Sequence, residues 1–196
     1  IRGAWSQIVD ELKRLSGKVS VCFEASTAYG HLYEMLSKAA VRVVVAHPGQ
    51  LRLIFRSKKK NDRADAEKLA KLLYLGEVPV VYVPSQNVRA WRQLVEYRRR
   101  LIGKRTRTKN ALRAILRSIG QRPPGQFGIW TLQGAAWLAQ VELPELTALQ
   151  RDLLQEELTM FNRQVERTEK ELERYSHDNP GVALLRTIPG VGIRTA

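Results

Sequence analysis

The spacing of apolar residues changes at Ser85, and this change constrains the possible fold more than any other feature. Before it, two short apolar segments, 19–24 and 41–46, alternate with amphipathic helical segments. An order of strand, helix, strand, helix is typical of a parallel or mixed α/β sheet. After Ser85, apolar residues recur every three or four positions over two long stretches, which predicts long helices. The sequence therefore predicts an α/β domain over 1–84 and a helical extension over 85–183.

Two further features describe the predicted sheet. The segment 41–46 is apolar almost throughout, as expected for a strand that is covered on both faces. A third predicted strand, 78–83, contains Pro79 and is therefore expected at an edge. A complete domain of this class needs more strands, and we expect them upstream of Ile1.

Asp62 and Asp65 stand three residues apart at the start of the helix predicted after Asn61. They fall on the same helical stripe as Leu69 and Leu72, so their carboxylates are expected to point toward the body of the domain. Inward carboxylates need a positive partner, and a divalent cation is a common one. The alternative is helix capping by Asn61 or Asp62, with an acid near the positive helix end. This segment alone favours capping.

Glu24 makes a metal site more favourable relative to helix capping. It ends the strand 19–24 at the carboxyl edge, where open α/β sheets place ligands. A solvated glutamate is the alternative for this residue taken alone. Three carboxylates that converge on one edge would suit Mg²⁺ or Mn²⁺, and such clusters support phosphoryl transfer. Glu24, Asp62 and Asp65 are therefore the candidate catalytic and metal-binding residues.

The charge balance predicts a polyanionic partner. The chain has 33 Lys and Arg residues against 19 Asp and Glu, a formal net charge of +14, which favours nucleic acid over a membrane. No acid occurs between Tyr97 and Val141, a stretch that contains ten cations. A merely solvated helix usually mixes both signs, so this run indicates nucleic-acid contact. The ten are Arg98, Arg99, Arg100, Lys104, Arg105, Arg107, Lys109, Arg113, Arg117 and Arg122.

The helical extension is predicted to form an antiparallel hairpin of 85–119 and about 145–176. Gly120 ends the first helix, and a Pro/Gly-rich connector near 120–128 allows the chain to reverse. The second helix carries a heptad seam typical of a coiled coil, which either packs on the first helix or forms a dimer interface. The seam residues are Leu154, Leu158, Phe161, Val165, Thr168, Leu172 and Tyr175.

The segment 184–196 has the signature of a helix-hairpin-helix. In Pro189-Gly190-Val191-Gly192, the glycines allow the backbone to approach phosphate, and a following helix would direct its N–H groups at the anion. Gly190 and Gly192 are therefore candidate nucleic-acid-binding residues. An ordinary glycine turn between helices is the alternative.

Other classes of protein are disfavoured. Cys22 is the single cysteine, so no disulfide framework exists and a reducing cytoplasm is expected. No apolar run reaches the roughly 20 residues of a membrane span, and no signal peptide is evident.

Five blocks together resemble the DEDD transposases of bacterial insertion sequences, the bridge-RNA-guided serine recombinases with a RuvC-like N-terminal domain. The similarity covers nearly the whole chain. Ser26-Thr27 replaces the expected Thr-Gly in the first block, and His47 replaces Asn in the second. The blocks are Glu24–Tyr29, Val43–Pro48, Lys60–Ala66, Arg99–Leu112 and Ile188–Gly192.

The resemblance implies a RuvC-like (RNase H-like) mixed sheet in which Glu24, Asp62 and Asp65 are three of four acidic ligands of Mg²⁺. The first Asp is expected upstream and a serine nucleophile downstream, so this fragment alone is expected to be inactive. The implied reaction is attack of serine on a DNA phosphodiester, followed by strand exchange. The implied partners are DNA, a structured guide RNA and further copies of the chain, at the bacterial nucleoid. The alternatives are a RuvC-like metal-dependent nuclease or resolvase, and a non-catalytic nucleic-acid scaffold.

Overall fold

The computed structural model describes residues 5–55, 61–123, 128–177 and 179–192. The chain forms two compact units, Ile1–Val88 and Arg89–Ala196. The first unit contains α1 (Trp5–Arg14), β1 (Ser20–Glu24), α2 (Tyr29–Leu36), β2 (Arg42–Ala46), α3 (Pro48–Ile54) and α4 (Asp62–Leu75). The second unit contains all but the first residues of α5 (Gln86–Ser118), and then α6 (Leu132–Gln140), α7 (Glu145–His177) and α8 (Pro180–Leu185).

Within the described residues, the sheet of the first unit is small and has two strands. β1 and β2 pair in parallel, from Ser20 opposite Arg42 to Glu24 opposite Ala46. The third predicted strand is present only as an antiparallel bridge between Ala46 and Val80, so the prediction of a full strand over 78–83 was wrong. Pro79 has no N–H to donate, which limits the pairing of this segment. The α/β class is confirmed in its coarse form, two parallel strands among helices.

The core of the first unit lies on both faces of β2. Val44 and Val45 point to opposite faces of the strand and are 6% and 1% exposed, so both faces are covered, as predicted for an almost wholly apolar strand. On the Val44 side, Leu51 of α3 and Leu72 of α4 pack against the strand. β2 therefore anchors α3 and α4 through this cluster.

The sequence analysis did not predict α3, although its start carries a recognisable signal. His47 is the N-cap, and its Nδ1 accepts a hydrogen bond from the Gln50 N–H at 3.3 Å. Pro48 occupies the first helical turn, where a missing N–H has no cost. His47 thus performs the capping role for which asparagine is a usual residue.

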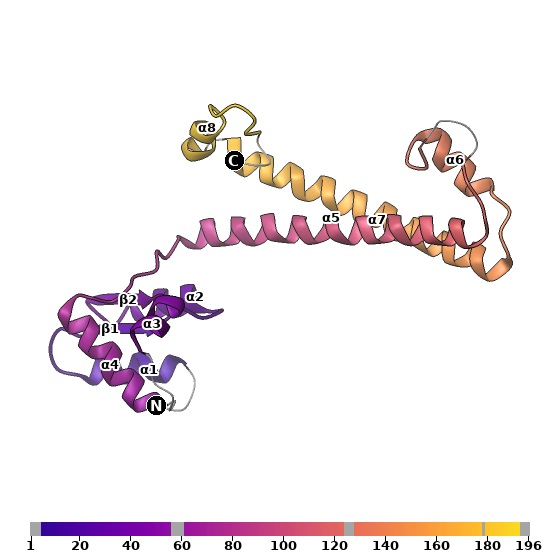
Figure 1. The fold of residues 1–196 in the computed structure, drawn as a ribbon. Coiled ribbons are helices and arrows are strands. Elements are labelled where there is room, and N and C mark those ends of the chain that lie inside the picture. The colour runs from indigo at the N-terminus through magenta and orange to yellow at the C-terminus, as the bar shows by residue number, and fades with distance from the viewer. Residues whose placement is uncertain (1–4, 56–60, 124–127, 178, 193–196) are drawn as a thin grey trace. The chain divides into compact units, whose positions relative to one another are not determined.

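In the second unit, α5 and α7 lie side by side and run in opposite directions (Figure 1). Leu101 of α5 packs against Phe161 and Val165 of α7, and all three are buried. Farther along, Leu112 of α5 shares a cluster with Leu158 of α7. Sequence positions on α7 fall as those on α5 rise, which defines an antiparallel pair. Regular coiled-coil packing along the pair stays a prediction.

Two polar contacts also join α5 and α7. Arg98 Nε donates to Glu169 Oε1 at 2.9 Å, and the Thr108 hydroxyl donates to Glu157 Oε2 at 3.1 Å. The side chains of Arg98 and Glu169 are only 19% and 24% exposed. A charged pair that is this well covered favours one register of the two helices, because a shift would leave each charge buried without its partner.

We expect Arg98→Gln to destabilise the second unit by about 1.5 kcal/mol, since it removes a charge-assisted hydrogen bond and leaves Glu169 partly buried. Urea unfolding followed by circular dichroism measures this change. Arg99→Gln is the matched control, because Arg99 pairs with Glu96 of its own helix and its side chain is 79% exposed. Equal midpoints for the two variants would show that the Arg98–Glu169 pair does not stabilise the hairpin.

The helix α6 and the turn before it were not predicted. Leu138 of α6 and the following Val141 pack against Leu112 and Leu116 of α5, where they cover the end of the helix pair. Thr131 caps α6 by accepting from the Gly134 N–H at 3.1 Å. The sequence signal was weak because α6 is short and follows directly on the Pro/Gly-rich connector. Residues 124–127 of that connector lie outside the described residues.

The C-terminal part begins with α8, which Asn179 caps through hydrogen bonds from the N–H groups of Gly181 and Val182. A turn follows, in which the Val191 N–H donates to the Ile188 carbonyl and Gly190 has a φ of +85°. Residues 193–196, where the second helix of the predicted motif would begin, lie outside the described residues. Among the described helices, none combines the length and the apolar character that crossing a membrane requires.

Candidate nucleic-acid interface

The candidate carboxylates of the first unit are solvent-accessible. Glu24 is exposed at the carboxyl end of β1, and Asp62 is exposed at the start of α4. Asp65 is half-exposed and lies 3.5 Å from the Lys68 ammonium. The expectation that Asp62 points toward the body of the domain was therefore wrong. Packing of α4 on the core begins at Leu69. In the first turn of α4, the helical stripe that contains Asp62 therefore lies outside the core.

The first turn of α4 has the geometry of a capped helix. Asn61 is the N-cap, and its side chain accepts from the Arg63 N–H at 3.1 Å. Asp62 and Asp65 then lie in the first turn, where the positive end of the helix dipole favours negative charge. This arrangement supports the capping interpretation of the segment and does not by itself require a metal.

The three carboxylates do not form a metal site in the part of the chain that the structure describes. No group of three His, Cys, Asp or Glu side chains in those ranges is placed so that it could hold an ion. Their oxygen atoms are of the type that Mg²⁺ and Mn²⁺ prefer. The donor type of Glu24, Asp62 and Asp65 thus fits a hard divalent cation, whereas their placement does not.

All of the basic run except Arg122 lies on α5, and several of its members are exposed. Arg100, Lys104 and Arg107 recur at intervals of four and three, so they follow one flank of the helix, and all three are exposed. We call these three residues the basic stripe. Such a row of cations can follow a phosphate backbone, because adjacent members are about one helical turn apart.

Three of the predicted nucleic-acid contacts are already engaged in ion pairs within the chain, and one of them is Arg100, whose Nε lies 3.6 Å from Glu96 Oε1. Arg98 is held by Glu169 of α7, as described above. Arg99 donates to both carboxylate oxygens of Glu96, at 2.9 and 3.0 Å. Hydrogen bonding from Arg99 lowers the pKa of Glu96. The sequence analysis missed both acids, because Glu96 lies just before the acid-free run and Glu169 lies on another helix.

Aromatic residues also contact the basic helix. The Lys109 ammonium and the Arg113 guanidinium lie 4.9 and 5.3 Å from the centre of the Trp130 ring. Burial lowers the pKa of Lys109, and the charges of Arg105 and Arg113 add to this effect. Trp130 therefore contacts two cations of the run and favours defined positions for them.

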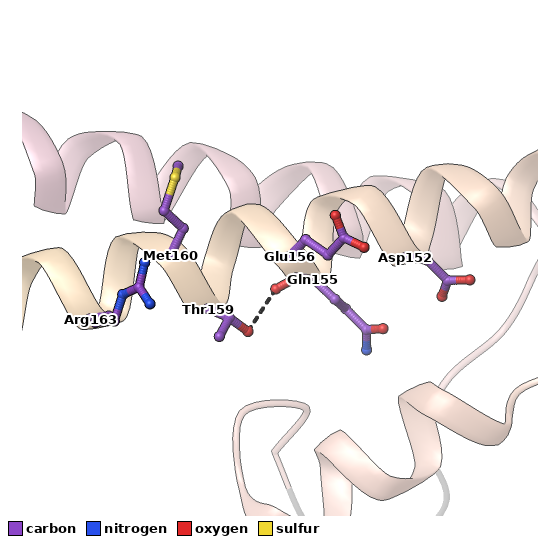
Figure 2. A pocket seen from close by; sticks show the side chains of 6 residues that line it. All are labelled: Asp152, Gln155, Glu156, Thr159, Met160 and Arg163. Carbon is purple, nitrogen blue, oxygen red and sulfur yellow. Dashed lines mark hydrogen bonds between the residues drawn. The ribbon is translucent and has the colours of Figure 1, made fainter.

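Two surface hollows differ in charge. The first, about 540 Å³, is bordered by one face of α7, and Figure 2 shows its six labelled side chains projecting from that helix. Its lining includes Asp152 and Glu156, which disfavour an anionic ligand. The second, about 430 Å³, lies at the end of α5 and has three arginines and no acid in its lining. Its residues are Arg113, Leu116, Arg117, Gln121, Arg122, Pro123 and Ile129.

The two candidate glycines at the C-terminal end lie in and after an exposed turn. Gly190 has a positive φ, which a glycine adopts readily, and a Cβ at either Gly190 or Gly192 would meet no atom within 4 Å. The backbone at Gly190 and Gly192 is thus open to approach. The N–H groups of the helix that was predicted to follow belong to residues 193–196, outside the described part.

Comparison with known proteins identifies a family and a relative. A family model of DEDD transposases of the IS110 type, described as transposase, matches residues 2–121. It therefore covers the first unit and the whole of α5, and it ends at the turn after that helix. The protein named "Putative transposase y4qE" of Sinorhizobium fredii is 30% identical over 141 residues, which are 71% of this chain. The chain spans only 35% of the length of that relative.

Proposed function

This chain belongs to the DEDD transposases of the IS110 type, and from that membership we propose that it takes part in cleaving and rejoining DNA when an insertion sequence moves. The observation that carries the proposal is the family match over the α/β unit together with all of α5. A transposase must hold a polyanion, and the part of α5 after Glu96, which is basic and contains no acid, supports the proposal.

The proposed partners are DNA and a structured guide RNA, which would contact the basic stripe and its exposed neighbour Arg117 through phosphates. Glu96 lies 3.6 Å from the Arg100 guanidinium at one end of the stripe. No acid follows Glu96 on α5, and this supports the assignment because no carboxylate of that helix lies beside Lys104, Arg107 or Arg117. The backbone at Gly190 and Gly192 is proposed as a second contact to the nucleic acid.

We also propose a homo-oligomer. The heptad seam packs on α5 from Leu154 to Val165 and is therefore not a free dimer surface there.

The proposed catalytic unit has a RuvC-like fold in which Glu24, Asp62 and Asp65 belong to a Mg²⁺ or Mn²⁺ site. The family resemblance and the oxygen ligands of these residues support such a site. The structure argues against it, because the three acids do not form a group that could hold an ion among the described residues. When bound, such a cation would neutralise charge that develops on a phosphodiester. The proposed nucleophile is a serine in the downstream part of the protein.

We expect Asp62→Asn with Asp65→Asn to weaken Mn²⁺ binding at least about tenfold without loss of folding, because each change removes a charged oxygen ligand. Calorimetric titration with Mn²⁺ measures the affinity, and thermal melting by circular dichroism measures the stability. The control is Asp10→Asn with Glu67→Gln, which removes the same charge at two exposed positions of the same unit.

The second candidate function is a non-catalytic nucleic-acid scaffold, and the placement of the acids favours it. Asn61 caps α4, and the described carboxylates form no metal-binding group. In that case the Asp62/Asp65 variant would bind Mn²⁺ like the control variant and lose only helix stability. A RuvC-like nuclease or resolvase instead shares the metal prediction and would hydrolyse DNA without a covalent protein intermediate.

A further inference from the structure

The end of α5 folds the chain back on itself and gathers arginines. The Gln121 N–H donates to the Leu116 carbonyl at 2.8 Å, and the Gly120 N–H donates to the Arg117 carbonyl at 3.1 Å. Gly120 has a φ of +71°, so these bonds form a Schellman motif with glycine at its left-handed position. The reversal brings Arg122 beside Arg113 and Arg117 of the helix, and the three border one hollow of about 430 Å³.

The walls of this hollow are fixed by packing. Leu116 is buried in the cluster that joins α5 to α6, and Ile129 packs against the same cluster. Arg113 is positioned by the Trp130 ring at 5.3 Å and by its own hydrogen bond to Asn110 Oδ1 at 3.1 Å. The site is thus partly preorganised, because at least one guanidinium need not be ordered when a ligand binds.

The described part of the chain places no counter-ion beside the arginines of the hollow. Neither Arg117 nor Arg122 forms an ion pair with any residue that the structure describes, and both are exposed. Three guanidiniums around one space repel one another, and an anion that shares the space would turn this repulsion into attraction. Guanidinium forks match the oxygens of a phosphate group in bidentate geometry.

We propose that Arg113, Arg117 and Arg122 form a pocket that binds a single phosphate group of a nucleic-acid strand. The inference that the ligand is nucleic acid rests on the proposed function. The pocket adds a defined contact at the end of the helix pair. The space is sufficient for one phosphate with part of its sugar, and the apolar side chains of Leu116, Pro123 and Ile129 border the rest. The phosphate belongs either to a strand end or to an internal phosphodiester.

The test compares the complete chain with Arg117→Gln plus Arg122→Gln. The control, Arg163→Gln plus Arg167→Gln, removes the same charge from exposed positions of α7. The probes are a short RNA with a 5′-phosphate, the same RNA with a 5′-hydroxyl, and inorganic phosphate, each titrated by calorimetry. A strand-end ligand predicts at least about tenfold weaker binding of the 5′-phosphorylated RNA alone, whereas an internal phosphodiester predicts that loss for both RNAs.

Equal affinities of the pocket and control variants for all three probes would overturn the proposal. If inorganic phosphate binds the wild-type chain but not the pocket variant, the result supports the pocket, whether or not the RNAs bind. If in addition neither RNA binds, the proposed function is contradicted and the pocket is not. A chain that binds no probe excludes the pocket. Arg117→Lys plus Arg122→Lys keeps the charge at both positions and guards against misfolding, and it should bind more weakly than wild type because lysine lacks the bidentate fork.

Discussion

Leu101→Ala is expected to destabilise the second unit by about 3 kcal/mol, within the range for removing a large buried aliphatic side chain. Leu101 is 1% exposed and packs between Phe161 and Val165, so the change leaves a cavity where α5 contacts α7. Urea unfolding monitored by circular dichroism at 222 nm gives the difference in free energy of unfolding. The helical signal should be lost at a lower urea concentration than in the wild-type chain.

The matched control is Leu146→Ala, the same change at a position of α7 that is 79% exposed. It should alter the stability by no more than about 0.5 kcal/mol, because no packed contact is lost. If the two alanine variants unfold at the same urea concentration, the contact of Leu101 with α7 does not hold the hairpin together, and the antiparallel arrangement loses its main support.

Replacing the basic stripe by glutamine, Arg100→Gln with Lys104→Gln and Arg107→Gln, should weaken binding to duplex nucleic acid on the order of a hundredfold at 0.1 M salt. For each phosphate contact that is lost, about one counterion fewer is released when the protein binds. The slope of log affinity against log salt should therefore become shallower by about 3. Glutamine is a good helix former, which keeps α5 intact. Fluorescence anisotropy at several salt concentrations measures both quantities.

A triple variant of α7 with the same charge change, Arg163→Gln with Arg167→Gln and Lys170→Gln, controls for net charge. These cations alternate with acids such as Glu166, so their local field is smaller. The control should keep most of the affinity and nearly the full salt slope. Should both triple variants behave alike, binding would depend on overall charge and not on the surface of α5.

The extent of the long helices could be predicted because their periodicity is a local property of the sequence. The helices predicted at 85–119 and about 145–176 correspond to α5, Gln86–Ser118, and α7, Glu145–His177. Gly120 marked the first end correctly, since its positive φ is required where the chain reverses. The short helices α3 and α6 were missed because seven and nine residues carry too little periodic signal.

The candidate carboxylates could be chosen from the sequence, but their surroundings could not. Helical periodicity put Asp62 and Asp65 on the stripe of Leu69, and it could not show that Asp62 is exposed and that packing on the core begins at Leu69. In the same way, the heptad seam was recognisable from sequence. Only the packing of Phe161 and Val165 on Leu101 showed that α5 of the same chain covers this part of it.

The sequence by itself determined the change at Ser85 from short alternating elements to long helices. It also determined the positive charge of α5 and the position where this helix ends. Each of these features depends on residues that are close together along the chain. Only the tertiary structure decided which cations remain available to a partner. Arg98 belongs to the basic run by sequence, yet Glu169, 71 positions away, holds it between two helices. Arg122 follows the helix in sequence, yet the turn at Gly120 places it beside Arg117. A charge acts through space, so its partners follow from the fold and not from its neighbours in the chain.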